Sequence, residues 1–174
     1  LAEMVKYGMI LDARLFALLE ANLDRLLRPD LEFYAEAIAR CCSLKAAVVA
    51  ADERESGTRA ILNYGHTFGH AIEAAQNYRG LAHGEAVAVG MVMAANLAEA
   101  GGELSAEVAR RQRELLAAIG LPTSVAGIDP ETILTAMSRD KKVAHGELRL
   151  VVPRAIGQVE LRPVADRAQL RAAI

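Results

Sequence analysis

Two glycine–histidine pairs, Gly65-His66 and Gly69-His70, lie four residues apart in an apolar, helix-favouring segment. In a helix this spacing puts both imidazoles on one face, about one turn apart. Glycine inside a helix costs about 1 kcal/mol relative to alanine, so two glycines at this interval indicate that something approaches the backbone closely. The segment therefore predicts a helix that crosses a neighbour tightly or contacts a ligand.

The rest of the chain has the composition of a helical protein. Hydrophobic residues make up 53% of the 174 residues, aromatic residues only 4%, and tryptophan is absent. Such a core is built from Ala, Leu, Val, Ile and Met, and apolar residues recur at helical spacing through most of the sequence. We expect a mainly α fold, one compact multi-helix domain over residues 1–174, with a small β-hairpin near the C-terminus.

Capping residues and helix breakers set the expected boundaries. Pro29 ends the first periodic segment, Asp30 caps the next, and Asp129-Pro130 opens a later one. The predicted helices span residues 1–28, 30–50, 60–77, 84–100, 105–119, 129–138 and 165–174. Alternating residues at 147–153 and 158–161 predict the two strands. In the helix at 30–50, burial is expected for one face, formed by Leu31, Tyr34, Ile38, Cys41, Leu44 and Val48.

Charge and cysteine content exclude several classes of function. Lys and Arg total 20 against 22 Asp and Glu, a net charge of −2, so no general attraction for nucleic acid or an anionic membrane is expected. The longest apolar run, residues 86–95, is too short to cross a bilayer. Cys41 and Cys42 are adjacent in a predicted helix and cannot join distant segments, so we expect small core residues in a reducing, cytoplasmic protein.

Three of the four histidines, His66, His70 and His83, fall within one short stretch. A catalytic zinc typically has three protein ligands and an open position, and three such side chains supply most of that set. The spacing alone favours His66 and His70 as ligands, although His-x-x-x-His without the glutamate of the zinc-protease motif is a weak signal. Histidines satisfied by ordinary hydrogen bonds, at the surface or in the core, are the alternative.

Charged side chains near predicted helix ends and in loops are candidates for a substrate site. The candidate cations are Lys6, Lys45, Arg59, Lys141 and Lys142. Two or three of them converging on one pocket would suit a substrate with phosphate and carboxylate groups, whereas solvated surface side chains are the alternative. The candidate carboxylates are Glu3, Glu55, Glu73 and Glu85, of which the last two are expected to be structural.

Five motifs in order resemble the 3-dehydroquinate synthase family. They are LAEMVKYG at residues 1–8, ADERESG at 51–57, LNYGHTFGHAIE at 62–73, HGEAVAVGM at 83–91 and RDKK at 139–142. The resemblance covers only the C-terminal, mainly helical domain of that family. It implies that the family's N-terminal domain, which binds NAD, is absent from this chain. One local difference is Tyr64, where many relatives have a smaller apolar residue.

The resemblance implies a role for each motif residue. The ligands of zinc, or of another divalent metal such as Co²⁺, would be Glu3, His66 and His83. His70 would then be an acid/base that contacts the substrate instead of a ligand, and Glu55 would be a further proton acceptor. The substrate-binding residues would be Lys6, Lys45, Arg59, Asn63 and one of the pair Lys141 and Lys142.

The implied reaction belongs to the shikimate pathway, which leads to chorismate and the aromatic amino acids. It converts 3-deoxy-D-arabino-heptulosonate 7-phosphate, a sugar-acid phosphate, to 3-dehydroquinate and phosphate. The C5 hydroxyl is transiently oxidised by NAD⁺, phosphate leaves, the ketone is reduced again, and the ring opens and closes by an aldol step. Zinc suits the oxidation because a Lewis acid acidifies the bound hydroxyl. Without the NAD-binding domain the chain alone is expected to be inactive, and the family is usually dimeric.

Two further interpretations fit parts of the sequence. One is another member of the same superfamily, either a different sugar-phosphate cyclase or a metal-dependent polyol dehydrogenase. The dehydrogenases typically use one Asp and three His as ligands, so Glu3 favours the synthase. A helical interaction domain with no site at all is the interpretation from a different class.

Overall fold

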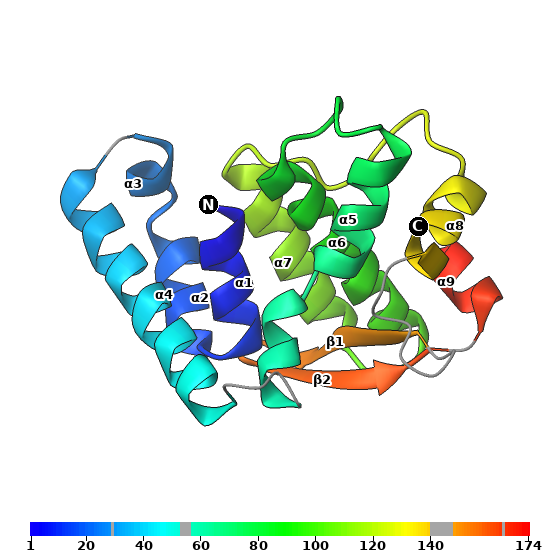
Figure 1. The fold of residues 1–174 in the computed structure, drawn as a ribbon. Coiled ribbons are helices and arrows are strands. Elements are labelled where there is room, and N and C mark those ends of the chain that lie inside the picture. The colour runs from blue at the N-terminus through cyan, green and yellow to red at the C-terminus, as the bar shows by residue number, and fades with distance from the viewer. Residues whose placement is uncertain (29, 53–56, 140–147, 165) are drawn as a thin grey trace.

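Helix α6 (His83–Ala100) lies at the centre of the molecule (Figure 1). The computed structural model describes residues 1–28, 30–52, 57–139, 148–164 and 166–174. Every residue of α6 from 86 to 95 is buried, as expected for a helix that is apolar on all faces. It contacts α1 (Ala2–Ile10), α5 (His66–Ala75), α7 (Ala106–Ala118), α9 (Arg167–Ala173) and β1 (Arg149–Ala155).

The remaining elements surround this central helix. On one side α2 (Ala13–Ala21) packs on α1, followed by α3 (Leu23–Leu27) and α4 (Leu31–Ala51). On the other side α8 (Pro130–Arg139) contacts α5 and α9. Strand β1 pairs antiparallel with β2 (Gln158–Pro163), and the hairpin lies across one end of the helices (Figure 1). The predicted mainly α fold with a hairpin near the C-terminus is confirmed.

The first 28 residues form three helices where the sequence predicts one. The side chain of Asp12 accepts hydrogen bonds from the backbone N–H groups of Arg14 (3.1 Å) and Leu15 (3.0 Å), which starts a new helix at that point. α2 then packs back on α1, where a Cβ on Gly8 would lie 3.0 Å from Phe16. The continuous apolar stripe concealed the break because both helices turn an apolar face to the same core.

The predicted helix at 60–77 is also divided. A 3₁₀ helix, η1 (Thr58–Asn63), precedes α5, and Gly65 between them has a φ of 77°, in the left-handed region that glycine tolerates best. His66 therefore begins α5, and likewise His83 is the first residue of α6. Both histidines thus lie at the start of a helix.

Helix α4 has the predicted bounds, with Asp30 accepting a hydrogen bond from the N–H of Phe33, but its predicted burial is partly wrong. Leu31 and Ile38 are 82% and 48% exposed, and Cys42 is exposed as well. α4 is at the edge of the fold, so only a narrow stripe of it is covered. The buried residues of this helix are Phe33, Ala37, Cys41 and Val48.

Helices α5 and α6 cross at glycines. A Cβ on Gly90 would overlap the carbonyl oxygen of Gly65 and lie 2.8 Å from the amide nitrogen of Gly69. A Cβ on Gly69 would in turn lie 3.2 Å from the backbone of Ala86. The close approach predicted from the glycine–histidine pairs is therefore that of a tightly crossing helix.

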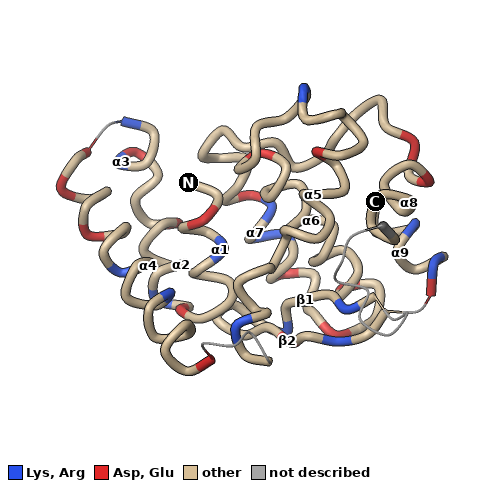
Figure 2. Tube along the Cα trace, viewed as in Figure 1, with Lys and Arg blue, Asp and Glu red and all other residues tan. Residues whose placement is uncertain are grey.

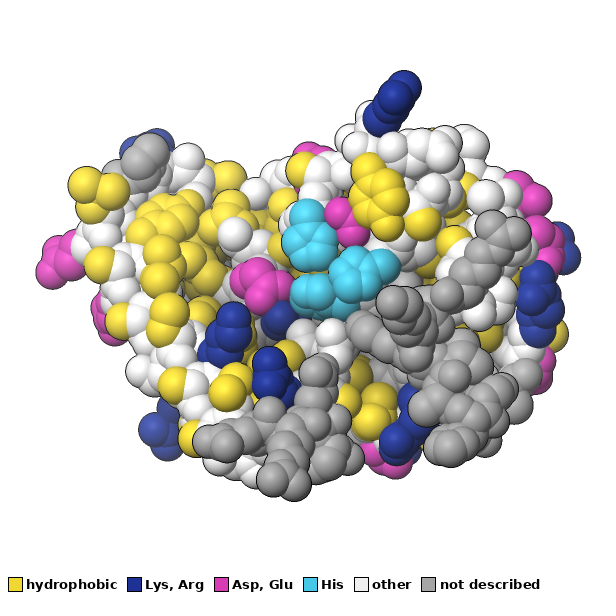
Figure 3. All heavy atoms as spheres, viewed as in Figure 1, with side chains coloured by type: hydrophobic (Ala, Val, Ile, Leu, Met, Phe, Trp, Pro, Cys, Tyr) yellow, Lys and Arg dark blue, Asp and Glu magenta, His cyan; other side chains and the backbone are white. Residues whose placement is uncertain are grey.

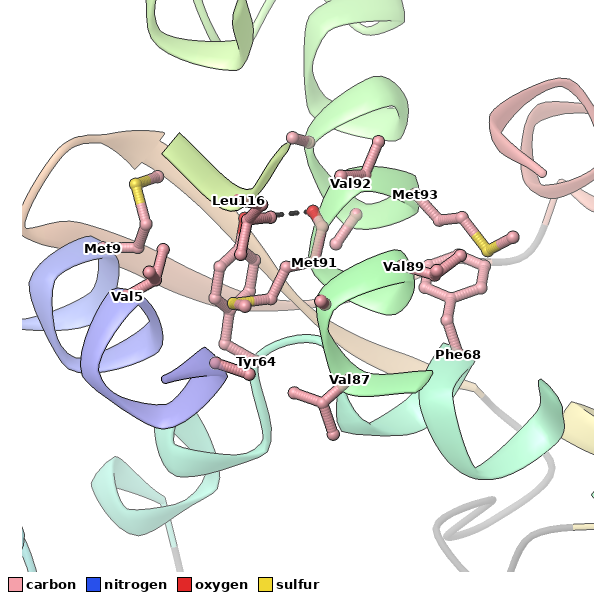
Figure 4. Close-up of a cluster of buried hydrophobic side chains, with 14 of the residues drawn as sticks. Val5, Met9, Tyr64, Phe68, Val87, Val89, Met91, Val92, Met93 and Leu116 are labelled. Carbon is pink, nitrogen blue, oxygen red and sulfur yellow. Dashed lines mark hydrogen bonds between the residues drawn. The ribbon is translucent and has the colours of Figure 1, made fainter. Parts of the chain in front are cut away.

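A tyrosine is enclosed in the core beside this crossing (Figure 4). The hydroxyl of Tyr64 donates to the side-chain oxygen of Gln112 at 2.6 Å, and the amide of Gln112 donates to the carbonyl oxygen of Met91 at 3.0 Å. Burial raises the pKa of Tyr64, with Gln112 acting in the opposite direction. Tyr64 is thus a buried link between the start of α5, α6 and α7.

Acidic and basic residues are interspersed along the described trace (Figure 2). None of the described helices combines the length and the apolarity that crossing a bilayer requires.

Candidate metal and substrate site

Three histidines from two helices meet on one face of the molecule (Figure 3). The ring centroids of His66 and His70 are 5.7 Å apart, those of His66 and His83 are 5.4 Å apart, and those of His70 and His83 are 5.8 Å apart. Two imidazoles that share a zinc ion have centroids roughly 5 Å apart, given zinc–nitrogen bonds of about 2 Å. The spacing of all three rings is therefore compatible with one shared ion.

His66 is held in one orientation by the backbone. Its Nδ1 lies 3.1 Å from the carbonyl oxygen of Tyr64, so Nδ1–H donates there and Nε2 keeps its lone pair. Burial lowers the pKa of His66 to about 4; the Tyr64 carbonyl opposes this shift and Lys6 adds to it. The imidazole is thus neutral at neutral pH, which is the form that binds a metal.

Glu3 lies between His66 and a buried lysine. Its Oε1 is 3.6 Å from Nε2 of His66, and its Oε2 is 2.7 Å from Nζ of Lys6. Lys6 is only 3% exposed, and burial lowers its pKa although Glu3 works in the opposite direction. The carboxylate of Glu3 therefore links a basic residue to the histidine cluster.

A second carboxylate, Glu73, lies against the cluster from the other side. Nδ1 of His83 is 3.2 Å from each carboxylate oxygen of Glu73. Glu73 was expected from the sequence to be structural, although it follows His66 by seven residues and His70 by three, which places all three on one face of α5. Glu85 does have the expected structural role, because its carboxylate accepts the N–H of Ala82 at 2.8 Å and caps α6.

The predicted substrate-binding side chains converge beside the histidines. A cavity of about 240 Å³ lies between α1, α4 and η1. Its lining residues are Glu3, Lys6, Tyr7, Lys45, Arg59, Leu62, Asn63 and His66. It thus includes every predicted substrate-binding residue in the described part of the chain, together with two of the three predicted metal ligands.

The buried carboxylate of Asp52 positions the 3₁₀ helix that carries Arg59 and Asn63. It accepts the backbone N–H of Gly57 at 2.8 Å and that of Arg59 at 3.0 Å. Asp52 ends α4, so it joins the helix of Lys45 to the segment of Arg59. The sequence indicates Asp52 only as part of a motif, because its hydrogen bonds to Gly57 and Arg59 depend on the tertiary structure.

His70 lines a second and larger space. This cavity has a volume of about 470 Å³, lies between α5 and α8, and also contains Glu73, Tyr78 and Met137 on its wall. A small molecule bound in this cavity would lie against the His70 ring. The position is suitable for a proton-transferring side chain.

A family model described as 3-dehydroquinate synthase C-terminal matches residues 1–143. The chain belongs to this family. The match covers all five motifs, at 1–8, 51–57, 62–73, 83–91 and 139–142, and therefore all the histidine and glutamate side chains of the site described above. It favours an enzyme domain over a helical interaction domain.

Solved structures of two cyclases share the fold of this chain. A 2-epi-5-epi-valiolone synthase from Streptomyces hygroscopicus subsp. jinggangensis 5008, with NAD⁺ and Zn²⁺ bound, matches 99% of the chain with a TM-score of 0.86 and 24% identity. A 2-deoxy-scyllo-inosose synthase complexed with carbaglucose-6-phosphate, NAD⁺ and Co²⁺ matches 98% with a TM-score of 0.81 and 28% identity. The chain covers 48% and 49% of the length of these two proteins.

Three predicted site residues of the family motifs lie outside the described residues. They are Glu55, Lys141 and Lys142. Their roles stay predictions, as does the choice between the two lysines.

Proposed function

We propose that this chain is the metal- and substrate-binding part of a 3-dehydroquinate synthase that acts on 3-deoxy-D-arabino-heptulosonate 7-phosphate. The observation that carries the proposal is the small cavity where Lys6, Lys45 and Arg59 meet beside Glu3 and His66. Lys6 is paired with Glu3, so Lys45 and Arg59 are the cations that suit the two anionic groups of such a substrate, a phosphate and a carboxylate. A sugar phosphate without a carboxylate offers only one such group.

The proposed metal ligands are Glu3, His66 and His83. Two imidazoles and one carboxylate form a known donor set for catalytic zinc, and Nε2 of His66 already faces the Glu3 carboxylate. When bound, the metal supplies Lewis-acid chemistry, which acidifies a substrate hydroxyl and polarises a neighbouring ketone. The neutral state of His66 supports its assignment as a ligand.

The remaining side chains orient the substrate and transfer protons. His70 lies one turn beyond His66 on the same face of α5 and is the proposed acid/base at a substrate oxygen. Lys45 and Arg59 are proposed to bind the anionic groups of the substrate, and Asn63 to bind a hydroxyl. Lys6 holds the Glu3 carboxylate and lines the same cavity.

A second candidate is a cyclase of a sugar phosphate that lacks a carboxylate. It is favoured by the likeness to 2-deoxy-scyllo-inosose synthase, whose solved complex contains carbaglucose-6-phosphate. The presence of two cations, Lys45 and Arg59, in addition to the Glu3-paired Lys6 favours the sugar-acid phosphate instead.

Binding measurements on the zinc-loaded chain distinguish the two candidates. We expect isothermal titration calorimetry to show tighter binding of 3-deoxy-D-arabino-heptulosonate 7-phosphate than of glucose 6-phosphate. Lys45→Met and Arg59→Met should each weaken the first ligand about tenfold, since each removes a charge-assisted hydrogen bond. Arg79→Met, an exposed cation outside the cavity, is the control. Equal or tighter binding of glucose 6-phosphate would contradict the proposal.

Turnover is a separate question from binding. We propose that NAD⁺ is bound mainly by a part of the protein outside this chain, as the family resemblance implies. The chain alone should therefore release no phosphate when substrate and NAD⁺ are added; phosphate is the readout because the cofactor is reduced only transiently in this reaction. Steady release of phosphate would contradict this part of the proposal.

A further inference from the structure

The contact between Glu73 and His83 is the part of the histidine cluster that the proposed function leaves unused. Both carboxylate oxygens of Glu73 lie 3.2 Å from Nδ1 of His83. The side chain of Glu73 is 12% exposed, whereas that of His83 is 55% exposed. An exposed imidazole at the first residue of a helix is thus held by a largely buried carboxylate on another helix.

The contact determines which ring nitrogen of His83 has a free lone pair. A neutral imidazole carries one proton, and an N–H that faces a carboxylate retains it. With the proton on Nδ1, the lone pair of His83 is on Nε2. The same holds for His66, whose Nδ1 faces the carbonyl oxygen of Tyr64. Two different acceptors therefore leave the same atom of both proposed ligands available for a metal.

We propose that Glu73 is a positioning residue of the metal site, which orients His83 and presents its Nε2 to the ion. The proposal rests on the proposed function, in which His83 is a ligand. A carboxylate that accepts the other N–H of a metal-binding histidine fixes the ring and makes it a stronger donor, and loss of such a partner typically weakens metal binding about 10- to 100-fold.

Direct coordination by Glu73 is the competing arrangement. Donor atoms of His70, Glu73 and His83 all lie within 4.8 Å of one another, so these three side chains form a second possible ligand set. The equal distances from both Glu73 oxygens to Nδ1 show that the carboxylate faces the ring of His83. This orientation favours positioning over coordination.

Zinc affinity of four proteins tests the proposal. Competition with a chromophoric chelator gives the Kd of the wild-type chain and of the variants Glu73→Ala, Glu73→Gln and Glu85→Gln. We expect Kd to rise about 10- to 100-fold for Glu73→Ala and less for Glu73→Gln, which keeps a neutral acceptor. Glu85→Gln removes an equal charge next to His83 but keeps its capping hydrogen bond, so its Kd should match the wild type.

The tautomer of His83 in the metal-free protein gives a readout that a purely structural role would not change. Long-range ¹H–¹⁵N spectra at about pH 8, above the usual histidine pKa, should show His83 protonated at Nδ1 in the wild type. In Glu73→Ala, part of the population should be protonated at Nε2. His66 provides an internal control, because its partner is the carbonyl of Tyr64.

Three outcomes would overturn these assignments in distinguishable ways. Unchanged zinc affinity and an unchanged His83 tautomer in Glu73→Ala would refute the positioning role while leaving the proposed function intact. Loss of zinc in both Glu73→Ala and His70→Ala, with zinc retained in Glu3→Gln, would make Glu73 a ligand and refute positioning. A wild-type chain that binds no zinc at all would refute the proposed function, and the metal-site role of Glu73 with it.

Discussion

Glu3, on the first helix, and His66, at the start of α5, face each other with Oε1 of the glutamate 3.6 Å from Nε2 of the histidine. We predict that the purified chain contains about one zinc per molecule, measured by elemental analysis. His66→Ala and His83→Ala should contain none and Glu3→Gln should bind more weakly, whereas His70→Ala should keep its zinc. Loss of zinc from His70→Ala but not from Glu3→Gln would show that His70 is a ligand and that Glu3 is not.

Removing the hydroxyl of Tyr64 should destabilise the protein. In Tyr64→Phe the side-chain oxygen of Gln112 loses its 2.6 Å partner inside the core, and an unpaired buried acceptor costs about 1–3 kcal/mol. Urea unfolding should show that decrease in the free energy of unfolding. Adding Gln112→Leu removes the second partner, so the double variant should be less destabilised than the sum of the two single variants. Additive effects would show that the two side chains are not coupled.

Any side chain at Gly90 should force α5 and α6 apart. A Cβ there would overlap the backbone of Gly65 and Gly69. Gly90→Ala should therefore lower the free energy of unfolding by about 3 kcal/mol. The same variant should weaken zinc binding, because moving α5 displaces His66. Gly101→Ala, at the end of the same helix, is the matched control, because its Cβ would have its nearest neighbour at 3.4 Å. Equal stability of both variants would contradict the proposed tight crossing.

Asp12 should contribute stability that depends on pH. Although burial alone would raise its pKa, hydrogen bonds from Arg40 and from the N–H groups of Leu15 and Arg14 produce a net lowering. Asp12→Ala should cost about 2 kcal/mol, and Asp12→Asn, which keeps the cap, about 1 kcal/mol. The depressed pKa means that the contribution is present above the unfolded-state pKa of about 4 and is lost as pH falls through the folded-state value. Urea unfolding of wild type and Asp12→Asn at several pH values should show their difference shrinking in acid.

His66 should titrate well below an ordinary histidine in the metal-free protein. Burial lowers its pKa to about 4, whereas the unfolded chain takes up this proton near pH 6.5. Its contribution to stability is therefore present above about pH 6.5 and is lost as pH falls through the folded-state value. An NMR titration gives the pKa directly. Between about pH 7 and 5, His66→Asn should lose less stability than wild type, and an equal loss would contradict the shift.

The parts of the fold that depend on local chemistry were predictable from the sequence. Asp30, Ser105 and Asp129 with Pro130 mark helix starts that the structure confirms, because a cap acts on the three residues that follow it. The breaks at Asp12 and Gly65 were missed. In both places helical periodicity continues across the break, and this continuity concealed the cap at Asp12 and the left-handed backbone at Gly65.

The site, like the fold, was predictable from the sequence only in part. The motifs identify the three histidines and Glu3, and helical spacing alone places His66 beside His70. Spacing could not show that the ring of His83 lies as near, at 5.4 Å from that of His66, nor that Lys45 and Arg59 line one cavity. Those contacts join α1, α4, η1, α5 and α6, which are far apart in the chain. Only the tertiary structure decided which acceptor faces Nδ1 of each histidine. The carbonyl of Tyr64 faces Nδ1 of His66, and the carboxylate of Glu73 faces Nδ1 of His83. The tautomer of a histidine depends on the acceptor that packing brings to the ring.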